Sequence, residues 1–324
     1  MRSTLEARQR NEHDTLKDFQ RRYKTFEMCN TRLLDLRKGV DKCITWWCPG
    51  SIDKDYRPLH GRKGYRCSIC NKEIRPAKGC LFGHTYIDLE TAFAITNELM
   101  WNRSGVPVIK IKERFGGAPD TIAKFMSAVR RQMGECLKDI KFDGDFVQID
   151  EAGILSGRKG YPRDHKYKKS RGSERTSTVV AFAEKKGRAR LFKVENCEAN
   201  TLLPLIKEHV SPSTTIYTDL WASYKPLTDL GYKHHAVNHD VEYLDVDTGA
   251  TTNACETIFS CFERTFKTYV SISDEHLHEY CNEIAFRQTF LKERDWGFET
   301  FLRSLSSLER KPGEQRLMEQ RQAA

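Results

Sequence analysis

Phe146-Val-Gln-Ile-Asp150 is a run rich in β-branched and aromatic residues that ends in an acid, and Glu151 follows it directly. Such a run is typical of a short buried strand. Thr214-Thr-Ile-Tyr-Thr-Asp219 repeats the pattern and also ends in an acid. The two acids can meet only if the two strands lie side by side, which depends on the segments between them.

Those segments predict how the strands are ordered. Thr178-Val-Val-Ala-Phe-Ala183 and Arg190-Leu-Phe-Lys-Val194 are further strands, joined by a turn at Lys185-Lys-Gly187, and an amphipathic helix follows over 198–210. Three strands in a meander, then a helix and a parallel fourth strand, predict a mixed α/β sheet of the ribonuclease H-like class. In that class the ends of the first and fourth strands are neighbours, so the two strand-end acids would lie side by side.

Two adjacent carboxylates predict a site for divalent cations, because like charges placed together are costly unless a cation neutralises them. Two Mg²⁺ or Mn²⁺ ions about 3.5–4 Å apart can activate water and stabilise the leaving oxygen of a phosphodiester. A third acid comes from a later helical segment, one face of which carries Glu256, Ser260, Glu263 and Lys267, while the opposite face carries Ile258, Phe262 and Phe266. The alternative is that Asp150 and Asp219 only cap turns.

Four cysteines are spaced like the ligands of a zinc site. Cys67-Ser-Ile-Cys70 can chelate one tetrahedral ion through a tight turn, and Cys43 and Cys48 provide a second, looser pair. His60 or Cys29 could replace one of these ligands. The alternatives are buried thiols or a redox pair, and a redox role is disfavoured because no strand and helix follow the motif. The pattern therefore predicts a zinc ribbon.

Two helices joined by a glycine turn are predicted between 108 and 133. Val108, Ile111 and Phe115 repeat at helical spacing before Gly116-Gly117-Ala118, and Pro119 then begins a second helix. The core face of that helix would carry Ile122, Phe125 or Met126, Val129 and Met133, and its partly basic outer face Thr121, Lys124, Ser127, Arg130 and Arg131. This is the arrangement of a DNA-binding helix-turn-helix, although any helical hairpin shares the pattern.

The charge of the chain indicates a polyanionic partner. The 324 residues include 54 Lys and Arg against 45 Asp and Glu, a net charge of +9. The excess is concentrated in two blocks, 57–84 and 156–175, each with a net charge of +6. Such blocks either track phosphates or form solvated loops. The second block directly follows the first acidic strand, where it could clamp a DNA backbone through Lys166, Lys168, Lys169 and Arg171.

Composition predicts an intracellular, multi-part protein. No apolar run approaches the about 18–20 residues of a membrane span, the first residues are too polar for a secretion signal, and the eleven cysteines are an odd number. We therefore expect free or metal-bound thiols in a reducing compartment, either a nucleus or a bacterial cytoplasm, and no membrane association. The expected parts are a helical arm (1–40), the zinc ribbon (41–85), the helix-turn-helix segment (86–135), the mixed-sheet domain (140–292) and a helical polar tail (293–324).

The sequence also resembles a known family. The motifs Ile149-Asp150-Glu151, Tyr217-Thr218-Asp219, Val237-Asn238-His239, Thr252-Asn253-x-x-Glu256 and His276-Leu277-x-x-Tyr280-x-x-Glu283 occur in the order found in DDE transposases of the Merlin superfamily and their bacterial insertion-sequence relatives. The resemblance covers about residues 43–290, and 36 residues lie between Asp219 and Glu256, a gap typical of such enzymes. Relatives often have Lys-Arg-Gly after the third acid, where this chain has Glu263-Arg264-Thr265.

The resemblance implies a DNA transposase in which Asp150, Asp219 and Glu256 hold two Mg²⁺ or Mn²⁺ ions. Asn253 would be an accessory group, or the third ligand in place of Glu256, and Glu263 a further accessory position. The resemblance also implies Zn²⁺ in the ribbon, double-stranded DNA as terminal repeats and target, and a homodimer or larger assembly. Two alternatives stay open: a domesticated transposase that binds DNA without catalysis, and a structure-specific nuclease with the same fold.

Overall fold

The structure is a computed structural model that describes residues 16–36, 43, 45, 47–59, 64–155, 176–185, 187–237, 251–269, 272–291 and 294–306. The chain divides into two compact units. The first comprises Met1–Glu98, Val108–Gln132 and Asp295–Ala324, and the second comprises Leu99–Pro107 and Met133–Arg294. The boundaries predicted from the sequence for the five parts stay predictions. None of the helices in the described residues combines the length and the apolar character of a membrane span.

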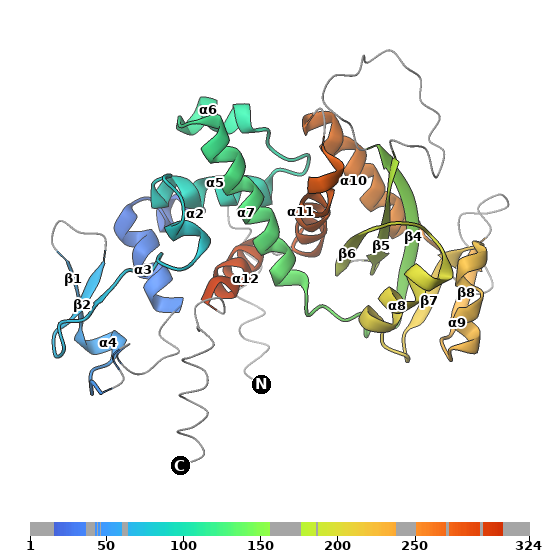
Figure 1. Cartoon of the computed structure of the whole chain (residues 1–324), viewed down its shortest axis with the longest axis horizontal. Helices are drawn as coiled ribbons and strands as arrows, with labels where there is room; N and C mark the ends of the chain where they lie inside the picture. The colour runs from blue at the N-terminus through green and yellow to red at the C-terminus, as the bar shows by residue number, and fades with distance from the viewer. Residues whose placement is uncertain are drawn as a thin grey trace. The chain divides into compact units, whose positions relative to one another are not determined.

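The second unit is built on a five-stranded mixed sheet (Figure 1), with the strand order β6-β5-β4-β7-β8. The strands are β4 (Phe146–Leu155), β5 (Thr176–Ala183), β6 (Ala189–Val194), β7 (Thr215–Asp219) and β8 (His234–Val237). The first three form an antiparallel meander, and β7 and β8 run parallel to β4. This confirms the predicted meander and parallel fourth strand, and adds β8, which the sequence did not predict.

One strand boundary differs from the prediction. β4 does not end at Asp150 but continues to Leu155, because β5 pairs with it along this stretch, from Gln148 opposite Ala183 to Leu155 opposite Thr176. Asp150 therefore lies within a strand, whereas Asp219 is the last residue of its strand, as expected.

Alternation along β4 separates two faces of the sheet, since successive side chains in a strand point to opposite sides. Val147 and Ile149 belong to the main core of this unit, with Leu202 and Ile206 of α8 (Ala199–His209). α9 (Pro226–Asp229) and the short 3₁₀ helix η3 (Ala222–Tyr224) contribute Leu227 and Tyr224 to the same core.

The opposite face carries Gln148 and Asp150, and helices from late in the chain cover it (Figure 1). The first turn of α10 (Asn253–Tyr269) contacts β4 and β5, because the Cys255 thiol lies 3.4 Å from the carbonyl oxygen of Gln148. α11 (Leu277–Thr289), which follows the 3₁₀ helix η4 (Asp274–His276), packs on β6, and the Thr289 hydroxyl accepts a hydrogen bond from the Ala189 N–H at 3.1 Å.

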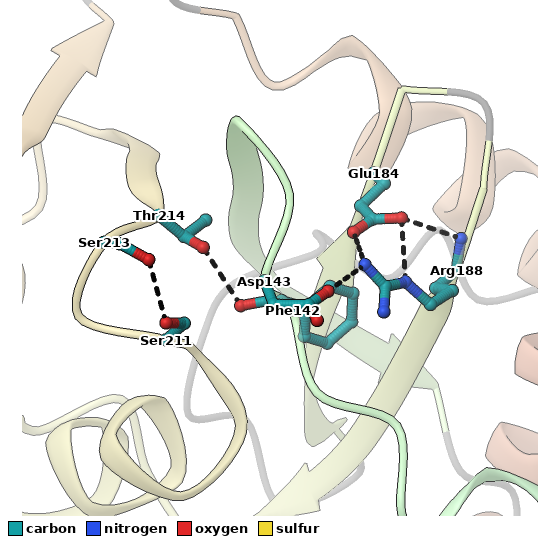
Figure 2. A network of polar contacts seen from close by, with 7 residues as sticks. All are labelled: Phe142, Asp143, Glu184, Arg188, Ser211, Ser213 and Thr214. Carbon is teal, nitrogen blue, oxygen red and sulfur yellow. Dashed lines mark hydrogen bonds and ion pairs between the residues drawn. The ribbon is translucent and has the colours of Figure 1, made fainter.

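An ion-pair network closes the end of the sheet where β4 and β7 begin (Figure 2). Arg188, in the turn before β6, donates to Glu184 at 2.6 Å and to Asp143 at 2.7 Å. Beside it the Thr214 hydroxyl donates to the Phe142 carbonyl oxygen at 3.1 Å. We call Asp143, Glu184 and Arg188 the Arg188 cluster.

The first unit is assembled from distant parts of the sequence. It contains the N-terminal helices α2 (Leu16–Arg22) and α3 (Phe26–Leu36), most of α5 (Leu89–Trp101), the C-terminal helix α12 (Arg294–Ser306), α6 (Val108–Phe115) and most of α7 (Pro119–Leu137). Four aromatic rings, with centroids 4.9–5.7 Å apart, join α2, α5 and α12: Phe19, Tyr23, Phe93 and Phe298. Arg32 of α3 and Glu299 of α12 form an ion pair.

This packing modifies two expectations about the chain ends. α2 and α3 belong to the core of a unit, and α12 is a core helix rather than a polar tail over its described residues. Its buried side chains follow helical spacing, at Phe298, Phe301, Leu302 and Leu305. That spacing is present in the sequence, but residues 307–324 are mostly polar, and they favoured the prediction of a polar tail.

A small antiparallel sheet lies in the region of the cysteines. It consists of β1 (Tyr56–Pro58), β2 (Tyr65–Cys67) and β3 (Glu73–Ile74) in that order, preceded by the short helix α4 (Ile52–Asp55) and followed by the 3₁₀ helix η2 (Leu81–Gly83). Tyr56, Tyr65 and Ile74 form a small core with the buried cysteines, and Leu34 of α3 packs against it.

α6 and α7 are joined by the predicted glycine turn. Gly116 and Gly117 have φ values of 75° and 93°, a region that residues with a Cβ rarely adopt, and the Gly116 N–H closes α6 by donating to the Lys112 carbonyl oxygen at 2.8 Å. α7 buries the predicted core face: Ile122, Phe125, Met126, Val129 and Met133.

Candidate functional site

Asp150 and Asp219 are set level with each other on neighbouring strands. β4 and β7 run parallel, with Gln148 opposite Tyr217. Two residues further along the same register, Asp150 comes level with Asp219. Neighbouring strands lie about 4.8 Å apart, and residues level in register point to the same face of a sheet. The backbone therefore holds these two acids as neighbours on the face that α10 covers.

Backbone amides orient both aspartates. Oδ1 of Asp150 accepts a hydrogen bond from the Glu151 N–H at 2.9 Å, and Oδ1 of Asp219 accepts one from the Trp221 N–H at 3.0 Å. Asp219 thus caps the turn after β7, the structural role that the sequence left open for it. Capping and ligand binding are compatible in principle, because the two oxygens of a carboxylate together offer about four acceptor positions.

Glu256 lies in the first turn of α10 and is exposed. Its neighbour Cys255 is buried between α10 and the sheet. Burial, followed by the charges of Asp150, Glu151 and Glu256, raises the pKa of the Cys255 thiol well above its ordinary value. The Cys255 thiol is therefore close enough to Asp150 and Glu151 to sense their charges, and Glu256 is its neighbour in the chain.

The two accessory positions are also on α10. Asn253 and Glu263 are both exposed, and the Asn253 N–H donates to the Thr251 hydroxyl at 3.2 Å. Glu263 lies seven residues beyond Glu256, so their backbones are about 10 Å apart along the helix axis. The predicted faces of this helix are confirmed by burial, since Ile258 and Phe262 are buried. Glu263 is thus on the same face as Glu256, but two turns away.

Sequence reasoning missed the role of Glu151. It points to the opposite face from Asp150 and is 4% exposed, and its Oε2 accepts a hydrogen bond from the buried Tyr224 hydroxyl at 2.6 Å. Burial, together with the charge of Glu151, raises the pKa of Tyr224 well above its ordinary value. The two-residue alternation of a strand is the signal that could have separated these adjacent acids.

The cysteines form the tightest candidate metal site in the described residues. The Sγ atoms of Cys43, Cys48, Cys67 and Cys70 all lie within 4.8 Å of one another. The Sγ of Cys43 is 3.5 Å from that of Cys70, and the Sγ of Cys48 is 3.8 Å from that of Cys67. Four sulfurs about 2.3 Å from a tetrahedral Zn²⁺ would be about 3.8 Å apart. The donor set and its spacing therefore fit zinc.

The local backbone also fits a bound ion. Backbone N–H groups of Thr45 and Gly50 point at the Sγ atoms of Cys43 and Cys48, each at 3.4 Å, as expected for amides that support thiolates. A Cβ added at Gly50 would lie 3.2 Å from the Cys67 Sγ and 3.3 Å from the Cys48 Sγ. Glycine at this position keeps the space around the sulfurs clear.

Two of these thiols differ in acidity. A hydrogen bond with the Thr45 side chain lowers the pKa of Cys70 to about 6, whereas burial raises the pKa of Cys48 to about 12. Cys29, one of the substitute ligands considered from the sequence, is buried in α3, where its thiol donates to the Tyr23 carbonyl oxygen at 3.5 Å, and it is not part of the cluster. The other substitute, His60, lies outside the described residues.

The carboxylates of Asp150, Asp219 and Glu256 do not form a group as tight as the four sulfurs among the residues that the structure describes. What brings them together is the register of β4 and β7 and the contact of α10 with β4. Backbone register and helix contact support the acidic site, whereas distances between ligand atoms support the cysteine site.

The outer face of α7 agrees with the prediction except at one residue. Lys124 and Arg131 are exposed, Thr121 and Ser127 are half-buried, and Arg131 donates to the Ser127 hydroxyl at 2.6 Å. Arg130, however, is only 4% exposed, so its assignment to the outer face is wrong. It follows the fully buried Met126 by one turn and therefore points to the core side of the helix.

The basic loop lies outside the described residues, which end at 155 and resume at 176. Lys166, Lys168, Lys169 and Arg171 therefore stay a prediction from the sequence. Two exposed apolar side chains that the sequence analysis did not single out lie directly after the second acid: Leu220 is 59% and Trp221 is 42% exposed.

Comparison with known proteins finds a family for part of the chain. Residues 141–289 match the model of the ISXO2-like transposase domain. These residues belong to the DDE transposase family. The matched range contains the five-stranded sheet and all three acids, and it confirms the family resemblance seen in the sequence motifs.

Curated relatives are similar at lower identity. An uncharacterized transposase-like protein of Haemophilus influenzae is 29% identical over 94 residues, which cover 29% of this chain and 75% of that protein. An uncharacterized protein in the transposable element ISH50 of Halobacterium salinarum is 22% identical over 242 residues, which cover 71% of this chain and 79% of that protein.

Solved complexes of the Mos1 protein align with this chain over much of its length. The Mos1 strand transfer complex covers 68% of this chain and 78% of the Mos1 chain, at 11% identity and a TM-score of 0.28. The Mos1 paired end complex with Mn covers 69% and 77%, at the same identity and TM-score. At that TM-score the likeness supports no inference about this chain.

Proposed function

We propose that the protein is an active DNA transposase whose mixed sheet is a ribonuclease H-like catalytic core. One observation carries the proposal: the parallel register of β4 and β7 pairs Gln148 with Tyr217. Continued by two residues, that register brings Asp150 level with Asp219, on the sheet face covered by the helix that bears Glu256, within a transposase-family domain. Acids arranged in this way suit the cleavage of a phosphodiester bond.

The residues at this site fit divalent cations of the Mg²⁺ or Mn²⁺ type. Such ions prefer carboxylate oxygens, and Asp150, Asp219 and Glu256 would hold two of them, with Asn253 nearby as an accessory group. The bound ions would supply Lewis-acid activation of a nucleophilic oxygen and stabilisation of the leaving oxygen. The chain itself orients the two aspartates through the amides of Glu151 and Trp221.

The four cysteines would hold one structural Zn²⁺. A Cys₄ site of this kind supplies folding free energy to a small domain that has little core of its own. Here it would fix the three-stranded sheet of β1, β2 and β3. The basic residues of the 57–84 block that the structure describes, such as Arg57 and Arg66, would then be available to contact DNA.

DNA binding is proposed for the ribbon and for the α6–α7 hairpin as a helix-turn-helix. Thr121, Lys124, Ser127 and Arg131 would meet the terminal repeats of the element, with phosphate contacts setting the register and a few side chains reading bases. Lys166, Lys168, Lys169 and Arg171 would contact the backbone near the cleaved bond. A dimer or larger assembly on paired ends is expected from the family.

Metal-dependent nicking of plasmid DNA tests the catalytic half of the proposal without knowledge of the element ends. Purified protein is incubated with supercoiled plasmid and Mn²⁺, beside Asp150→Ala, Asp219→Ala and Glu256→Gln variants and an EDTA control. We expect nicking by the wild type only. Glu263→Gln is the comparison variant, because it makes the same change on the same exposed helix face two turns away, and as an accessory position it should lose less nicking than Glu256→Gln.

The possible results separate the competing functions. If the Glu256→Gln variant nicks DNA and the Glu263→Gln variant does not, then Glu263 rather than Glu256 is the third acid. DNA binding without any nicking would favour a domesticated transposase that acts as a DNA-binding protein. Cleavage of branched DNA without joined products would favour a structure-specific nuclease, whereas joined products would support strand transfer.

Chelation tests the binding half. Removal of Zn²⁺ should abolish salt-dependent DNA binding if recognition depends on the ribbon. Binding that survives loss of the metal would assign recognition to the α6–α7 hairpin instead. A Cys67→Ser variant, which removes one ligand, should reproduce the effect of chelation at the ribbon alone.

A further inference from the structure

The first turn of α10 is attached to the sheet rather than capped only within its own segment. The first N–H groups of a helix have no partner inside the helix. Here the Ala254 N–H donates to Oε1 of Gln148 at 2.7 Å, and Gln148 belongs to β4 and is only 1% exposed. Intrahelical bonding starts two residues later, where the Glu256 N–H donates to the Thr252 carbonyl oxygen at 3.1 Å. A strand side chain thus takes the part of a helix cap.

A second contact holds the same turn. The Cys255 thiol is fully buried and lies 3.4 Å from the Gln148 carbonyl oxygen and 3.5 Å from the Ala181 carbonyl oxygen. A thiol carries one proton and is a weak donor, so this contact mainly indicates how closely α10 approaches β4 and β5. The directional link between helix and strand is therefore the Gln148 side chain.

The placement of this link relative to the acids is symmetrical. Gln148 precedes Asp150 by two residues and points to the same face of β4. Ala254 precedes Glu256 by two residues in the same helical turn. One hydrogen bond therefore joins the strand that carries the first acid to the helical turn that carries the third. Each bonded residue is only two residues away from its acid.

We propose that Gln148 is a positioning residue that sets the distance between Asp150 and Glu256, and through it the affinity of the acidic site for divalent cations. This inference rests on the proposed function. A glutamine suits the position because it is long enough to reach α10 and accepts a hydrogen bond without a charge. A permanently ionised acceptor would add a like charge beside three carboxylates, which is costly.

The test compares Gln148→Leu, which removes the acceptor, with Gln148→Glu, which keeps a carbonyl acceptor and whose carboxyl would be neutral when buried beside acids. We measure the Mn²⁺ concentration that half-saturates plasmid nicking, and Mn²⁺ binding directly, by the electron paramagnetic resonance signal of the free ion. In Gln148→Leu we expect both midpoints to rise about tenfold, the size of effect that a lost hydrogen bond gives. In Gln148→Glu they should stay within about twofold of the wild type.

Thr289→Val is the matched control. It also removes a side-chain acceptor from a backbone N–H that joins a helix to the sheet, in this case the Ala189 N–H at 3.1 Å. Both Mn²⁺ midpoints should remain those of the wild type in this variant, while its thermal stability falls. If Gln148→Leu does not fold, Gln148→Met offers a more flexible side chain without the acceptor.

The outcomes distinguish the inference from the function on which it rests. Unchanged Mn²⁺ midpoints in Gln148→Leu, with only a lower melting temperature, would overturn the positioning role. Failure of Gln148→Glu to restore them would do the same. If the wild type binds Mn²⁺ through Asp150 but never nicks DNA, the proposed function fails while the binding midpoints still decide the role of Gln148. A wild type that binds no Mn²⁺ would overturn both.

Discussion

Acidic residues just before β4 and acidic residues beside its middle have different hydrogen-bond partners. Near its start, Asp143 and Glu184 both accept hydrogen bonds from one guanidinium, that of Arg188 (Figure 2). Further along, Asp150 and Asp219 accept hydrogen bonds from backbone amides. A guanidinium neutralises a carboxylate, whereas an amide orients it and leaves its charge in place. The first arrangement is typical of a structural ion pair, and the second is compatible with the cation site that we propose for Asp150 and Asp219.

The largest effect should come from neutralising the oriented acids. Asp150→Asn or Asp219→Asn should lower Mn²⁺-dependent nicking by more than about 100-fold, since even partners that only support metal ligands are worth 10–100-fold. The melting temperature should stay the same or rise, because removing one of two neighbouring like charges relieves repulsion. A variant that loses stability as well as activity would show that Asp150 and Asp219 stabilise the fold. They would then not differ from the acids of the Arg188 cluster.

The opposite result is expected at the Arg188 cluster. Arg188→Met should lower the free energy of unfolding by about 1–2 kcal/mol, because the charge-assisted hydrogen bonds of its guanidinium to two partly exposed carboxylates are lost. Nicking should persist. Urea unfolding of the mixed-sheet unit, followed together with nicking at a temperature where both variants are folded, measures this. Lys193→Met, which breaks the ion pair of Lys193 with the one carboxylate of Asp274, is a control with a smaller expected loss. Loss of nicking in folded Arg188→Met would show that the acidic site depends on the Arg188 cluster.

A weaker effect should appear as a pH dependence of stability. The hydrogen bond from Arg188 lowers the pKa of Asp143 below its ordinary value. The native state therefore binds the proton less readily than the unfolded state, so the contribution of Asp143 is present above about pH 4 and is lost as the pH falls further. Stability of Asp143→Asn, measured by urea unfolding from pH 6 to pH 3, should fall less steeply than that of the wild type. Parallel curves would mean that the ion pair contributes nothing.

The smallest effect concerns His209, at the same end of the sheet, where its carbonyl oxygen accepts a hydrogen bond from the Phe142 N–H at 2.8 Å. Burial, and then the charge of Arg190, lowers the pKa of the His209 ring. The neutral ring is favoured in the native state, so stability should be lost as the pH falls below about 6.5. His209→Gln should flatten the melting temperature between pH 7.5 and pH 5.5, and an unchanged slope would contradict this.

Much of the fold follows from local patterns. The strands β4, β5, β6 and β7 are predictable from the sequence because β-branched and aromatic residues alternate or run together there. The cysteine cluster is predictable because its two ligand pairs have spacings that allow chelation. β8 is not predictable, since His234-His-Ala-Val237 is four residues long with no alternation. Its strand conformation comes from pairing with β7, a contact that no local pattern encodes.

The site was less predictable than the fold. The sequence identified Asp150, Asp219 and Glu256 by type and order, but not that β4 continues past Asp150, because that depends on the partner strand β5. Nor could it show that Gln148 reaches α10, a contact across 106 residues of sequence. A basic side chain such as that of Arg130 is expected on the exposed face. It lies on the core side instead, because it follows the buried Met126 by one helical turn.

The aromatic contacts of Phe19 and Tyr23 with Phe298 have a consequence for how the protein is made. A ribosome releases the N-terminal helices long before α12 exists, and synthesis proceeds at about 5–20 residues per second. The first unit, which contains the cysteine cluster and the α6–α7 hairpin, can therefore complete its core only after the whole mixed sheet has been translated. In a nascent or prematurely terminated chain that unit would be unfinished, so any binding activity that depends on its core would be acquired only late in synthesis.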